Sequence, residues 1–267
     1  MLFRRTIGAP CLAVLSGILT AGCSPVAESP SEGLTIFAAA SLAEILPEVG
    51  THFQKFHDIE LEFHFASSGT LAQQLMASPS ADIYLSASDR WLSEVEDMGV
   101  CDPETRRSLF SNSLVVVGNE QSNWNLVSPS KIPEIDFKWL VIGDPESVPA
   151  GEYAREWLSH LTTSEGSTVW SALRGRVSNA PDARAVLAQV KAHRSNLGIT
   201  YATDFSMTPE GLNQLYQVPR EIAPPIAYYA ASISSTKQPE LAISFLDFLE
   251  SRLAKEIFTR HGFTEPN

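Results

Sequence analysis

The chain has 267 residues, of which 44% are hydrophobic and 19% charged. This ordinary globular composition excludes a disordered or low-complexity protein and fits one large domain or two small ones. It carries 19 Lys and Arg against 31 Asp and Glu, a net charge of −12. Such acidity argues against nucleic acid as a partner, because phosphate backbones are bound by clustered basic side chains.

The first segment in chain order has the features of a secretory signal. Two arginines precede an uncharged, mostly apolar stretch over residues 6–22, which contains a proline and lies at the short limit for a membrane span. The stretch leads into Leu-Thr-Ala-Gly-Cys ending at Cys23, which resembles a bacterial lipobox. We expect a lipoprotein signal peptide over residues 1–22, lipid on Cys23 and a polar tether over residues 23–33. The alternative is a cleaved signal followed by an incidental cysteine.

The mature chain alternates predicted strands with predicted helices. Short β-rich or alternating runs predict strands at residues 34–38, 59–66, 82–86, 114–118, 139–143, 198–202 and 226–231. Apolar residues at helical spacing predict helices at residues 41–56, 70–77, 88–98, 151–161, 182–193 and 238–261. This alternation implies βαβ units and parallel-rich sheets.

Two local features of these elements carry specific expectations. Ser41 stands where the N-cap of the first helix belongs, and Pro47 should give that helix an irregular first turn or a kink. The near-continuous apolar run over residues 114–118 is typical of a strand in a parallel sheet that is buried on both faces.

Sequence motifs for catalysis or metal binding are largely missing. The nucleotide-binding, zinc-protease and serine-hydrolase motifs are absent from the sequence. Asp58, Glu60, Glu62 and His64 alternate on one strand face, but side chains two apart on a strand stand parallel rather than converge, so we expect a solvated face and no metal site. Cys101 is expected to be a buried, idle thiol.

Small residues mark four strand-to-helix junctions, at residues 38–41, 67–70, 144–151 and 179–183. Backbone N–H groups and the positive end of the helix dipole are free at such positions, and small side chains let an anion approach them. In open α/β sheets, ligands bind at the carboxyl ends of strands, where these junctions lie. Four such junctions without a catalytic motif favour a binding cleft for a small anion.

The same junctions carry a family resemblance. The segment Gly-Asp-Pro-Glu-Ser-Val-Pro-Ala-Gly-Glu-Tyr-Ala over residues 143–154 resembles the periplasmic molybdate-binding proteins of ABC importers. Six further segments match that family in order, at residues 37–42, 65–72, 81–87, 112–117, 197–204 and 257–263. The resemblance covers nearly the whole mature chain.

The resemblance implies an α/β, two-lobed periplasmic-binding-protein fold of type II, in which each lobe is a mostly parallel sheet flanked by helices. Lobe 1 would comprise residues 34–113 and 226–267, and lobe 2 residues 114–225, with the ligand cleft between them. The family's ligand contacts fall on Ser41, Ser68, Ala150, Ala183 and Tyr201. Ala150 and Ala183 would contribute backbone N–H groups, and the other three would contribute hydroxyls.

The implied function is the capture of molybdate or tungstate for an ABC permease and its ATPase, at the periplasmic or extracytoplasmic face. The resemblance implies a monomer with no enzyme activity, no cofactor and no direct metal coordination. The lipobox-like segment adds that lipid on Cys23 would hold this monomer to the membrane. Both oxyanions are fully deprotonated, so a site made only of hydrogen-bond donors suits them. Sulfate is the nearest alternative ligand, because it has the same charge and shape in a smaller ion.

Two other function classes stay open from the sequence. One is a secreted hydrolase on an α/β fold that uses Ser41 or Ser68, which would need a partnering histidine near those serines. The other is an adhesion or structural lipoprotein without a small ligand. Thermal melts with different oxyanions discriminate among these classes, because a bound ligand stabilises the native state by mass action.

Overall fold

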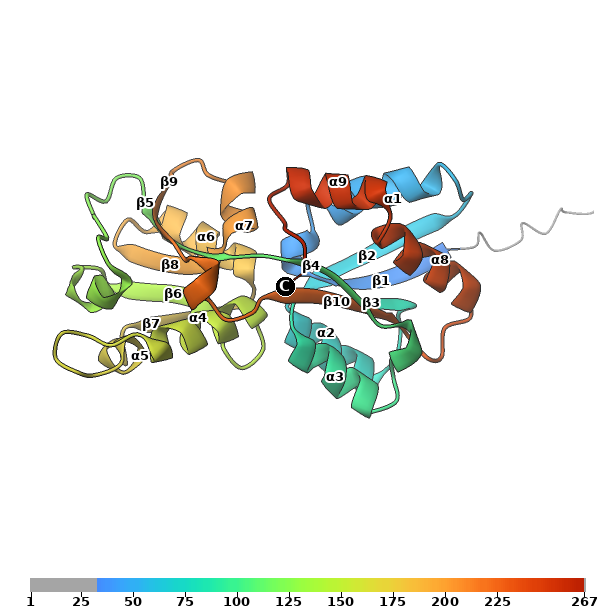
Figure 1. Ribbon diagram of the computed structural model, residues 1–267, viewed down its shortest axis with the longest axis horizontal. Helices are drawn as coiled ribbons and strands as arrows, with labels where there is room; N and C mark the ends of the chain where they lie inside the picture. The colour runs from blue at the N-terminus through green and yellow to red at the C-terminus, as the bar shows by residue number, and fades with distance from the viewer. Residues whose placement is uncertain (1–32, 267) are drawn as a thin grey trace, which may run out of the picture. The chain divides into compact units, whose positions relative to one another are not determined.

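The computed structural model describes residues 33–266, and within them the strands form two five-stranded sheets flanked by helices (Figure 1). Sheet 1 has the order β2-β1-β3-β10-β4 and sheet 2 the order β7-β6-β8-β5-β9. The strands of sheet 1 are β1 (Gly33–Ala39), β2 (Glu60–Ala66), β3 (Ile83–Ser86), β4 (Arg107–Ser111) and β10 (Ala227–Ser232). Those of sheet 2 are β5 (Leu114–Asn119), β6 (Trp139–Gly143), β7 (Val177–Ala180), β8 (Asn196–Tyr201) and β9 (Leu212–Gln217).

Both sheets use the same arrangement of strand directions. In sheet 1, β1 pairs in parallel with β2 and β3, whereas β10 pairs antiparallel with β3 and β4. In sheet 2, β6 pairs in parallel with β7 and β8, whereas β5 pairs antiparallel with β8 and β9. Four strands of each sheet therefore point one way and one points the other, which confirms the predicted α/β fold of mostly parallel sheets. The prediction that residues 114–118 lie between parallel neighbours was wrong, since β5 is the reversed strand.

The helices fall close to their predicted positions. The longer ones are α1 (Leu46–Gln54), α2 (Ser68–Ala77), α3 (Asp89–Asp97), α4 (Pro149–His160), α6 (Ala183–Ala192), α8 (Pro239–Leu249) and α9 (Arg252–Arg260). Shorter helical turns are η1 (Ala40–Leu42), η2 (Pro103–Thr105), η3 (Pro129–Glu134), α5 (Val169–Ala172), α7 (Ala202–Met207) and η4 (Arg220–Ile222). No helix of the described residues is long and apolar enough to cross a membrane.

Two helix boundaries differ from the sequence expectation. Ser41 is not an N-cap: it lies inside the η1 turn, and α1 begins only at Leu46. Pro47 then occupies the first turn of α1, where its missing N–H has no intrahelical partner to lose, so the irregular start that we expected is present. The predicted helix 238–261 is two helices, because Ser251 accepts a hydrogen bond from the amide of Ala254 (3.2 Å) and starts α9 anew.

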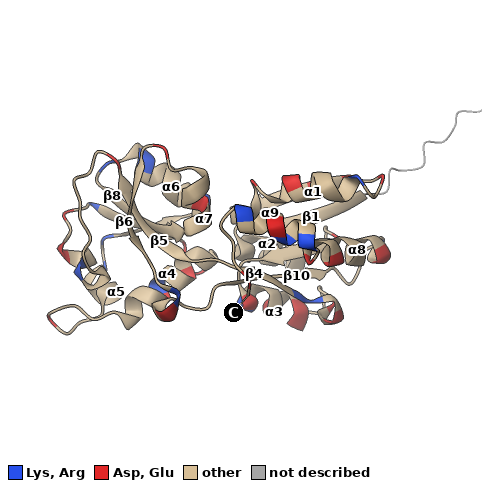
Figure 2. Ribbon diagram, turned by 45° about the horizontal axis from the view of Figure 1, so that its top comes forward, with Lys and Arg blue, Asp and Glu red and all other residues tan. Residues whose placement is uncertain are grey.

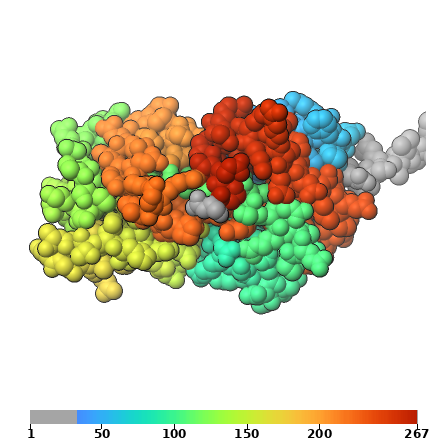
Figure 3. Space-filling model, in the orientation of Figure 1, coloured from blue at the N-terminus to red at the C-terminus, as the bar shows by residue number. Residues whose placement is uncertain are grey.

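Alternating side chains of the strands feed cores on the two faces of each sheet. In sheet 1, Ile36 belongs to the core that includes α1 and α8, whereas Phe37 packs with α2 and α3. In sheet 2, Val116 belongs to the same core as Trp157 of α4, whereas Val115 packs with α6. Figure 3 shows the C-terminal helices beside the segment that contains α1, and Arg260 and His261 pair there with the carboxylate of Glu48.

Charged residues of both signs are interspersed along helices and loops, while strands β5, β6 and β8 carry none (Figure 2). The alternating residues Glu60, Glu62 and His64 lie exposed on β2. Among the described residues, no group of three or more His, Cys, Asp or Glu side chains is placed to hold a metal ion. Cys101 is buried and free, and burial raises the pKa of its thiol to about 12.

The chain passes between the two sheets twice within the described residues. It leaves sheet 1 after β4, enters sheet 2 at β5 through Asn112 and Ser113, and returns after β9 through residues 218–226 to form β10. Residues 114–217 thus contribute all five strands of sheet 2, and sheet 1 combines strands from both sides of that segment.

Candidate functional site

A small cavity lies where the strand-to-helix junctions of the two sheets meet. It is lined by Ala39, Ala40, Ser41, Ser67, Ser68, Ala87, Val148, Pro149, Ala150, Asp182, Ala183 and Tyr201. The structure therefore brings all five sequence-predicted site residues to one place. The cavity has a volume of about 10 Å³, whereas pockets for drug-sized organic ligands have roughly 300–1,000 Å³. The size favours a small inorganic ligand.

Three helices begin at this cavity. Ser68 is the first residue of α2, Ala150 the second of α4 and Ala183 the first of α6. The N–H groups of a first helical turn have no intrahelical acceptor, and the helix dipole makes this end positive. The local caps take other amides: Ser67 accepts from Thr70 (3.2 Å), and Asp182 accepts from Arg184 (2.9 Å) and Ala185 (2.8 Å). The amides of the predicted site residues are left for a ligand.

Three hydroxyl groups complete the set of donors. Ser68 Oγ accepts a hydrogen bond from the amide of Ala87 (3.0 Å), which leaves its own proton to donate. Ser41 Oγ lies 2.9 Å from the hydroxyl of Tyr228. The Tyr201 hydroxyl is fully buried and, within the described residues, has no hydrogen-bond partner. An unpaired buried hydroxyl is costly, so a ligand acceptor at this position would remove that cost.

The pKa of Tyr201 is held well above its ordinary value, chiefly because burial disfavours the charged phenolate and also because Tyr228 and Tyr153 lie nearby. The hydroxyl therefore keeps its proton over the whole physiological pH range and can donate it to an anion. Tyr201 ends β8 and immediately precedes α7, which places it at the carboxyl end of the central strand of sheet 2.

Basic side chains are missing from this cavity: of the described residues, no Lys, Arg or His lines it. One acidic residue, Asp182, does line it, although the sequence predicted a site made only of hydrogen-bond donors. Asp182 sits at the junction before α6, and its Oδ1 atom already accepts from two backbone amides of that helix. The sequence placed Asp182 at the start of the predicted helix 182–193, and it indicated neither the N-cap role of this residue nor its place in the cavity wall.

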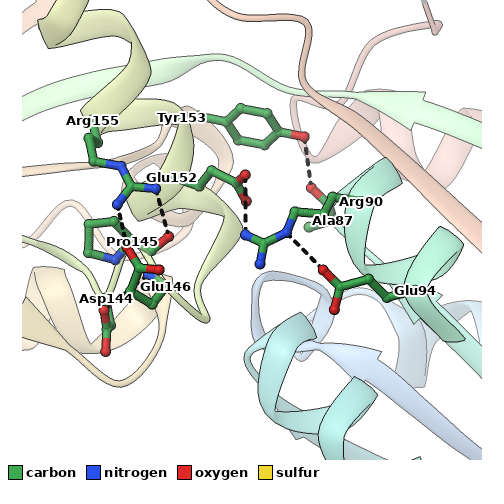
Figure 4. A network of polar contacts seen from close by, with 9 residues as sticks. All are labelled: Ala87, Arg90, Glu94, Asp144, Pro145, Glu146, Glu152, Tyr153 and Arg155. Atoms are coloured by element: carbon green, nitrogen blue, oxygen red, sulfur yellow. Dashed lines mark hydrogen bonds and ion pairs between the residues drawn. The ribbon is translucent and has the colours of Figure 1, made fainter. Parts of the chain in front are cut away.

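Four contacts join the two sides of the cavity. The amide of Gly69 in α2 donates to the carbonyl of Ser147 (2.9 Å), and the Tyr153 hydroxyl of α4 donates to the carbonyl of Ala87 (3.3 Å). Arg90 of α3 pairs with Glu152 of α4 at 3.5 Å, and Arg184 of α6 pairs with Glu44 beside η1. Figure 4 shows Arg90, Glu152, Tyr153 and Ala87 meeting between the two halves.

A larger groove adjoins the cavity and shares Ala40 and Asp182 with it. Its volume is about 510 Å³, and α6 contributes much of its wall, including Arg184 and Lys191. The groove is wide open and lacks the three converging hydroxyls. The small cavity is therefore the better candidate for a specific site.

Comparison with known proteins defines the class. The family described as "Bacterial extracellular solute-binding protein" matches residues 34–264. The chain is 34% identical over 235 residues to "Molybdate-binding protein ModA" of Escherichia coli, covering 86% of this chain and 88% of that protein. It is 29% identical to "Putative ABC transporter substrate-binding lipoprotein YvgL" of Bacillus subtilis, covering 94% and 95%.

Among solved structures, the periplasmic molybdate-binding protein of Azotobacter vinelandii matches with a TM-score of 0.74 at 18% identity, covering 88% of this chain and all of that one. At this identity the likeness concerns the fold. The chain belongs to the bacterial extracellular solute-binding proteins, which bind solutes for transport rather than transform them. The resemblance found in the sequence is confirmed at the level of the family.

Proposed function

We propose that the protein captures molybdate, and also tungstate, outside the cytoplasm and delivers it to an ABC permease that its ATPase drives. The observation that carries the proposal is the cavity of converging donors, in which three hydroxyls and three helix N-termini meet without a basic side chain. The relative from Escherichia coli, named a molybdate-binding protein, supports this choice of anion.

The chemistry of the ligand fits the donors. Molybdate and tungstate carry no proton at neutral pH, so each oxygen accepts hydrogen bonds and none donates. Hydroxyls of Ser41, Ser68 and Tyr201 and the amides of Ala150 and Ala183 are the proposed ligand contacts. Oriented dipoles would offset the two negative charges, as they do where backbone amides and helix ends bind anions.

A hydrolase is the weaker reading of the same serines. Activation of a serine requires a base within hydrogen-bond reach, yet no histidine lines the cavity within the described residues. The hydroxyls of Ser41 and Ser68 contact Tyr228 and the amide of Ala87 instead. Neither partner is a base at neutral pH, so solute binding without catalysis is the function that we propose.

The decisive experiment is a set of thermal melts of the purified protein with molybdate, tungstate, sulfate and phosphate. Ligand in about 100-fold excess over its Kd stabilises the native state by about 2.7 kcal/mol, so molybdate and tungstate should raise Tm by several degrees. Sulfate, which is smaller, and hydrogen phosphate, which carries a proton, should raise it far less. If sulfate raised Tm more than molybdate did, sulfate would be the ligand instead. If no oxyanion raised Tm, the proposal would be refuted.

We also propose that the mature protein is a monomer with two lobes, lobe 1 formed by residues 34–113 and 226–267 and lobe 2 by residues 114–225. Lipid on Cys23 would anchor this monomer to the membrane. Residues 1–32, which contain the signal and most of the tether, lie outside the described residues. The name of the Bacillus relative, a putative lipoprotein, supports the anchor. The variant Cys23→Ser should move the protein from the membrane fraction to the soluble fraction; a wild-type protein that is already soluble would refute the anchor.

A further inference from the structure

The hydroxyl of Ser41 is the end of a hydrogen-bonded chain that begins at the first crossing between the sheets. Asn112 lies between β4 and β5, and its Nδ2 atom lies 3.3 Å from the hydroxyl oxygen of Tyr228 on β10. That hydroxyl lies 2.9 Å from Ser41 Oγ in the cavity wall. All three residues are buried. The chain thus links the candidate ligand contact to two residues that do not line the cavity.

The direction of the hydrogen bonds follows from the amide of Asn112. Its Oδ1 atom accepts from the backbone amide of Ser113 (2.8 Å), which fixes which end of the side chain is the NH₂ group. The NH₂ group can only donate, and it donates to Thr203 Oγ1 (2.8 Å) and to the Tyr228 oxygen. Tyr228 therefore accepts from Asn112, and its single proton is left for Ser41.

The Tyr228 hydroxyl lies at hydrogen-bond distance from Ser41 Oγ, and the Tyr201 ring is a neighbour at 6.0 Å between ring centroids. The two hydrogen-bond partners of Tyr228 within the described residues are Asn112 and Ser41. The nearby carboxylate of Asp204 makes no hydrogen bond to it. Burial raises the pKa of Tyr228, so the phenol stays protonated. Because Asn112 can only donate to the Tyr228 oxygen, we infer that the phenol gives its proton to Ser41 Oγ, which leaves the serine O–H free to point at a ligand.

We propose that Asn112 and Tyr228 are positioning residues that fix the hydroxyl of Ser41 as a hydrogen-bond donor, and that they thereby make the site select tetrahedral dianions without a proton. The inference rests on the proposed function, because it concerns the same cavity. It adds the residues that decide which protonation state of a ligand is accepted.

Ser41 is the site hydroxyl whose role as a donor depends on another side chain, so a substitution of that side chain can change the selection against protonated ligands. Ser68 is held as a donor by the backbone amide of Ala87, which no substitution removes, whereas Ser41 is held by the side chain of Tyr228. A serine hydroxyl without a fixed partner can rotate and either donate or accept. Loss of the Tyr228 hydroxyl would therefore let Ser41 accept the proton of a ligand such as hydrogen arsenate.

The first experiment compares selenate with hydrogen arsenate as competitors of bound molybdate, at mildly alkaline pH, where arsenate is mostly a dianion with one proton. The two probes have the same charge and nearly the same size, and they differ by that proton. Wild type should prefer selenate. Tyr228→Phe should reduce this preference about 2- to 12-fold, the range for one hydrogen bond, and Asn112→Ala should shift it in the same direction.

The matched control is Tyr84→Phe. Tyr84 is also a fully buried tyrosine of sheet 1, and its hydroxyl donates to the backbone carbonyl of Ser68 (2.7 Å) rather than to a site hydroxyl. Its removal should lower Tm and leave the preference unchanged. Tyr228→Phe keeps the ring that packs against Phe110 and Phe263, so we expect this variant to fold. An equal loss of both probes in Tyr228→Phe would show a merely structural role and overturn the proposal.

The second experiment needs molybdate alone. In a double-mutant cycle, Ser41→Ala should cost at least about 3-fold less affinity in the Tyr228→Phe background than in wild type, because the two hydroxyls act as one unit. Additive losses would refute the chain. A wild type that fails to bind molybdate would instead refute the proposed function, so the two failures are distinct.

Discussion

Ser67 and Ser68 are neighbours in sequence, but the structure gives their hydroxyls different tasks. Ser67 Oγ accepts from the amide of Thr70 and lies 2.7 Å from its hydroxyl, so it caps α2. Ser68 Oγ accepts from Ala87 across the loop and faces the cavity as a donor. Stability and ligand affinity should therefore separate at these two positions.

The first prediction concerns these serines and Tyr201. Ser68→Ala and Tyr201→Phe should each lower molybdate affinity about 10- to 150-fold, since a hydrogen bond to a charged group contributes roughly 1.5–3 kcal/mol. Ser67→Ala should chiefly lower the free energy of unfolding, by about 0.5–2 kcal/mol as for other N-caps. Calorimetric titration and denaturant melts of the same variants check this; unchanged affinity in both Ser68→Ala and Tyr201→Phe would refute the site.

A second prediction concerns Asp204, which is buried next to Tyr201 and has no hydrogen-bond partner for either oxygen within the described residues. Burial raises its pKa from 3.8 to about 7, with Asp182 and Glu44 raising it further and Arg184 opposing them. Between these two pKa values the folded state holds a proton that the unfolded state has lost. Asp204 therefore lowers stability as pH rises from about 4 to about 7, with no further change above.

Asp204→Asn removes this pH dependence. Relative to wild type, the variant should gain stability over that window and keep a constant advantage, on the order of a few kcal/mol, above about pH 7. Urea melts of both proteins at a series of pH values measure the difference. A difference that does not vary with pH would mean that Asp204 is already ionised at low pH in the folded protein.

At the scale of elements, Gly69 marks the closest approach of α2 to the other side of the cavity. A Cβ atom there would lie 2.5 Å from the carbonyl oxygen of Ser147 and 2.6 Å from the ring of Trp91. The third prediction is that Gly69→Ala weakens molybdate binding about 5- to 150-fold, because relieving an overpacked contact costs typically 1–3 kcal/mol. Binding like wild type would show that the two sides need not approach this closely.

The ion pair between Glu44 and Arg184 joins η1 to α6, and both side chains are about half exposed. Exposed pairs contribute up to about 1 kcal/mol, so the fourth prediction is that Glu44→Gln weakens molybdate binding by up to about 5-fold at low salt. The direction of the change in affinity separates two effects of Glu44. If its carboxylate only repelled the anion, the Glu44→Gln substitution would tighten molybdate binding instead. Titration at about 50 and about 500 mM salt should show the difference fading as the pair is screened.

The control for that variant is Glu146→Gln. Glu146 also lies near the cavity and pairs with Arg155, but both residues belong to the segment that builds sheet 2 (Figure 4). This ion pair lies within one side of the cavity, so its loss should weaken binding less than the loss of the Glu44–Arg184 pair. A loss equal to that of Glu44→Gln would point to net charge as the cause.

Much of this arrangement was readable from the sequence, and what was missed has physical reasons. Buried strands such as β5 can be predicted from their apolar runs. The strands β7 and β9 are polar edge strands, and β9 has Asn213 and Gln214 exposed, so their sequences contain no apolar run that predicts a strand. The site serines and tyrosine lie at local junctions that a sequence motif can mark. The contact between Ser41 and Tyr228 joins residues 187 apart, and no local pattern encodes such a contact.

At the scale of the whole molecule, the order in which strands join the two sheets matters. Sheet 2 uses one continuous segment, residues 114–217, whereas sheet 1 requires β10 to pair between β3 and β4. Within the described residues, sheet 1 therefore cannot be completed between β3 and β4 until β10, near the end of the chain, has joined it.

This topology has a consequence for how the protein acquires its structure. The pairing of β3 with β10 closes a loop of more than a hundred residues, and such non-local contacts cost more chain entropy than the local ones of sheet 2. During refolding, sheet 2 should therefore form first, with sheet 1 and the ligand site following. Pulse-labelled hydrogen exchange should protect amides of β6 and β8 before those of β3; protection in the reverse order would contradict this sequence of events.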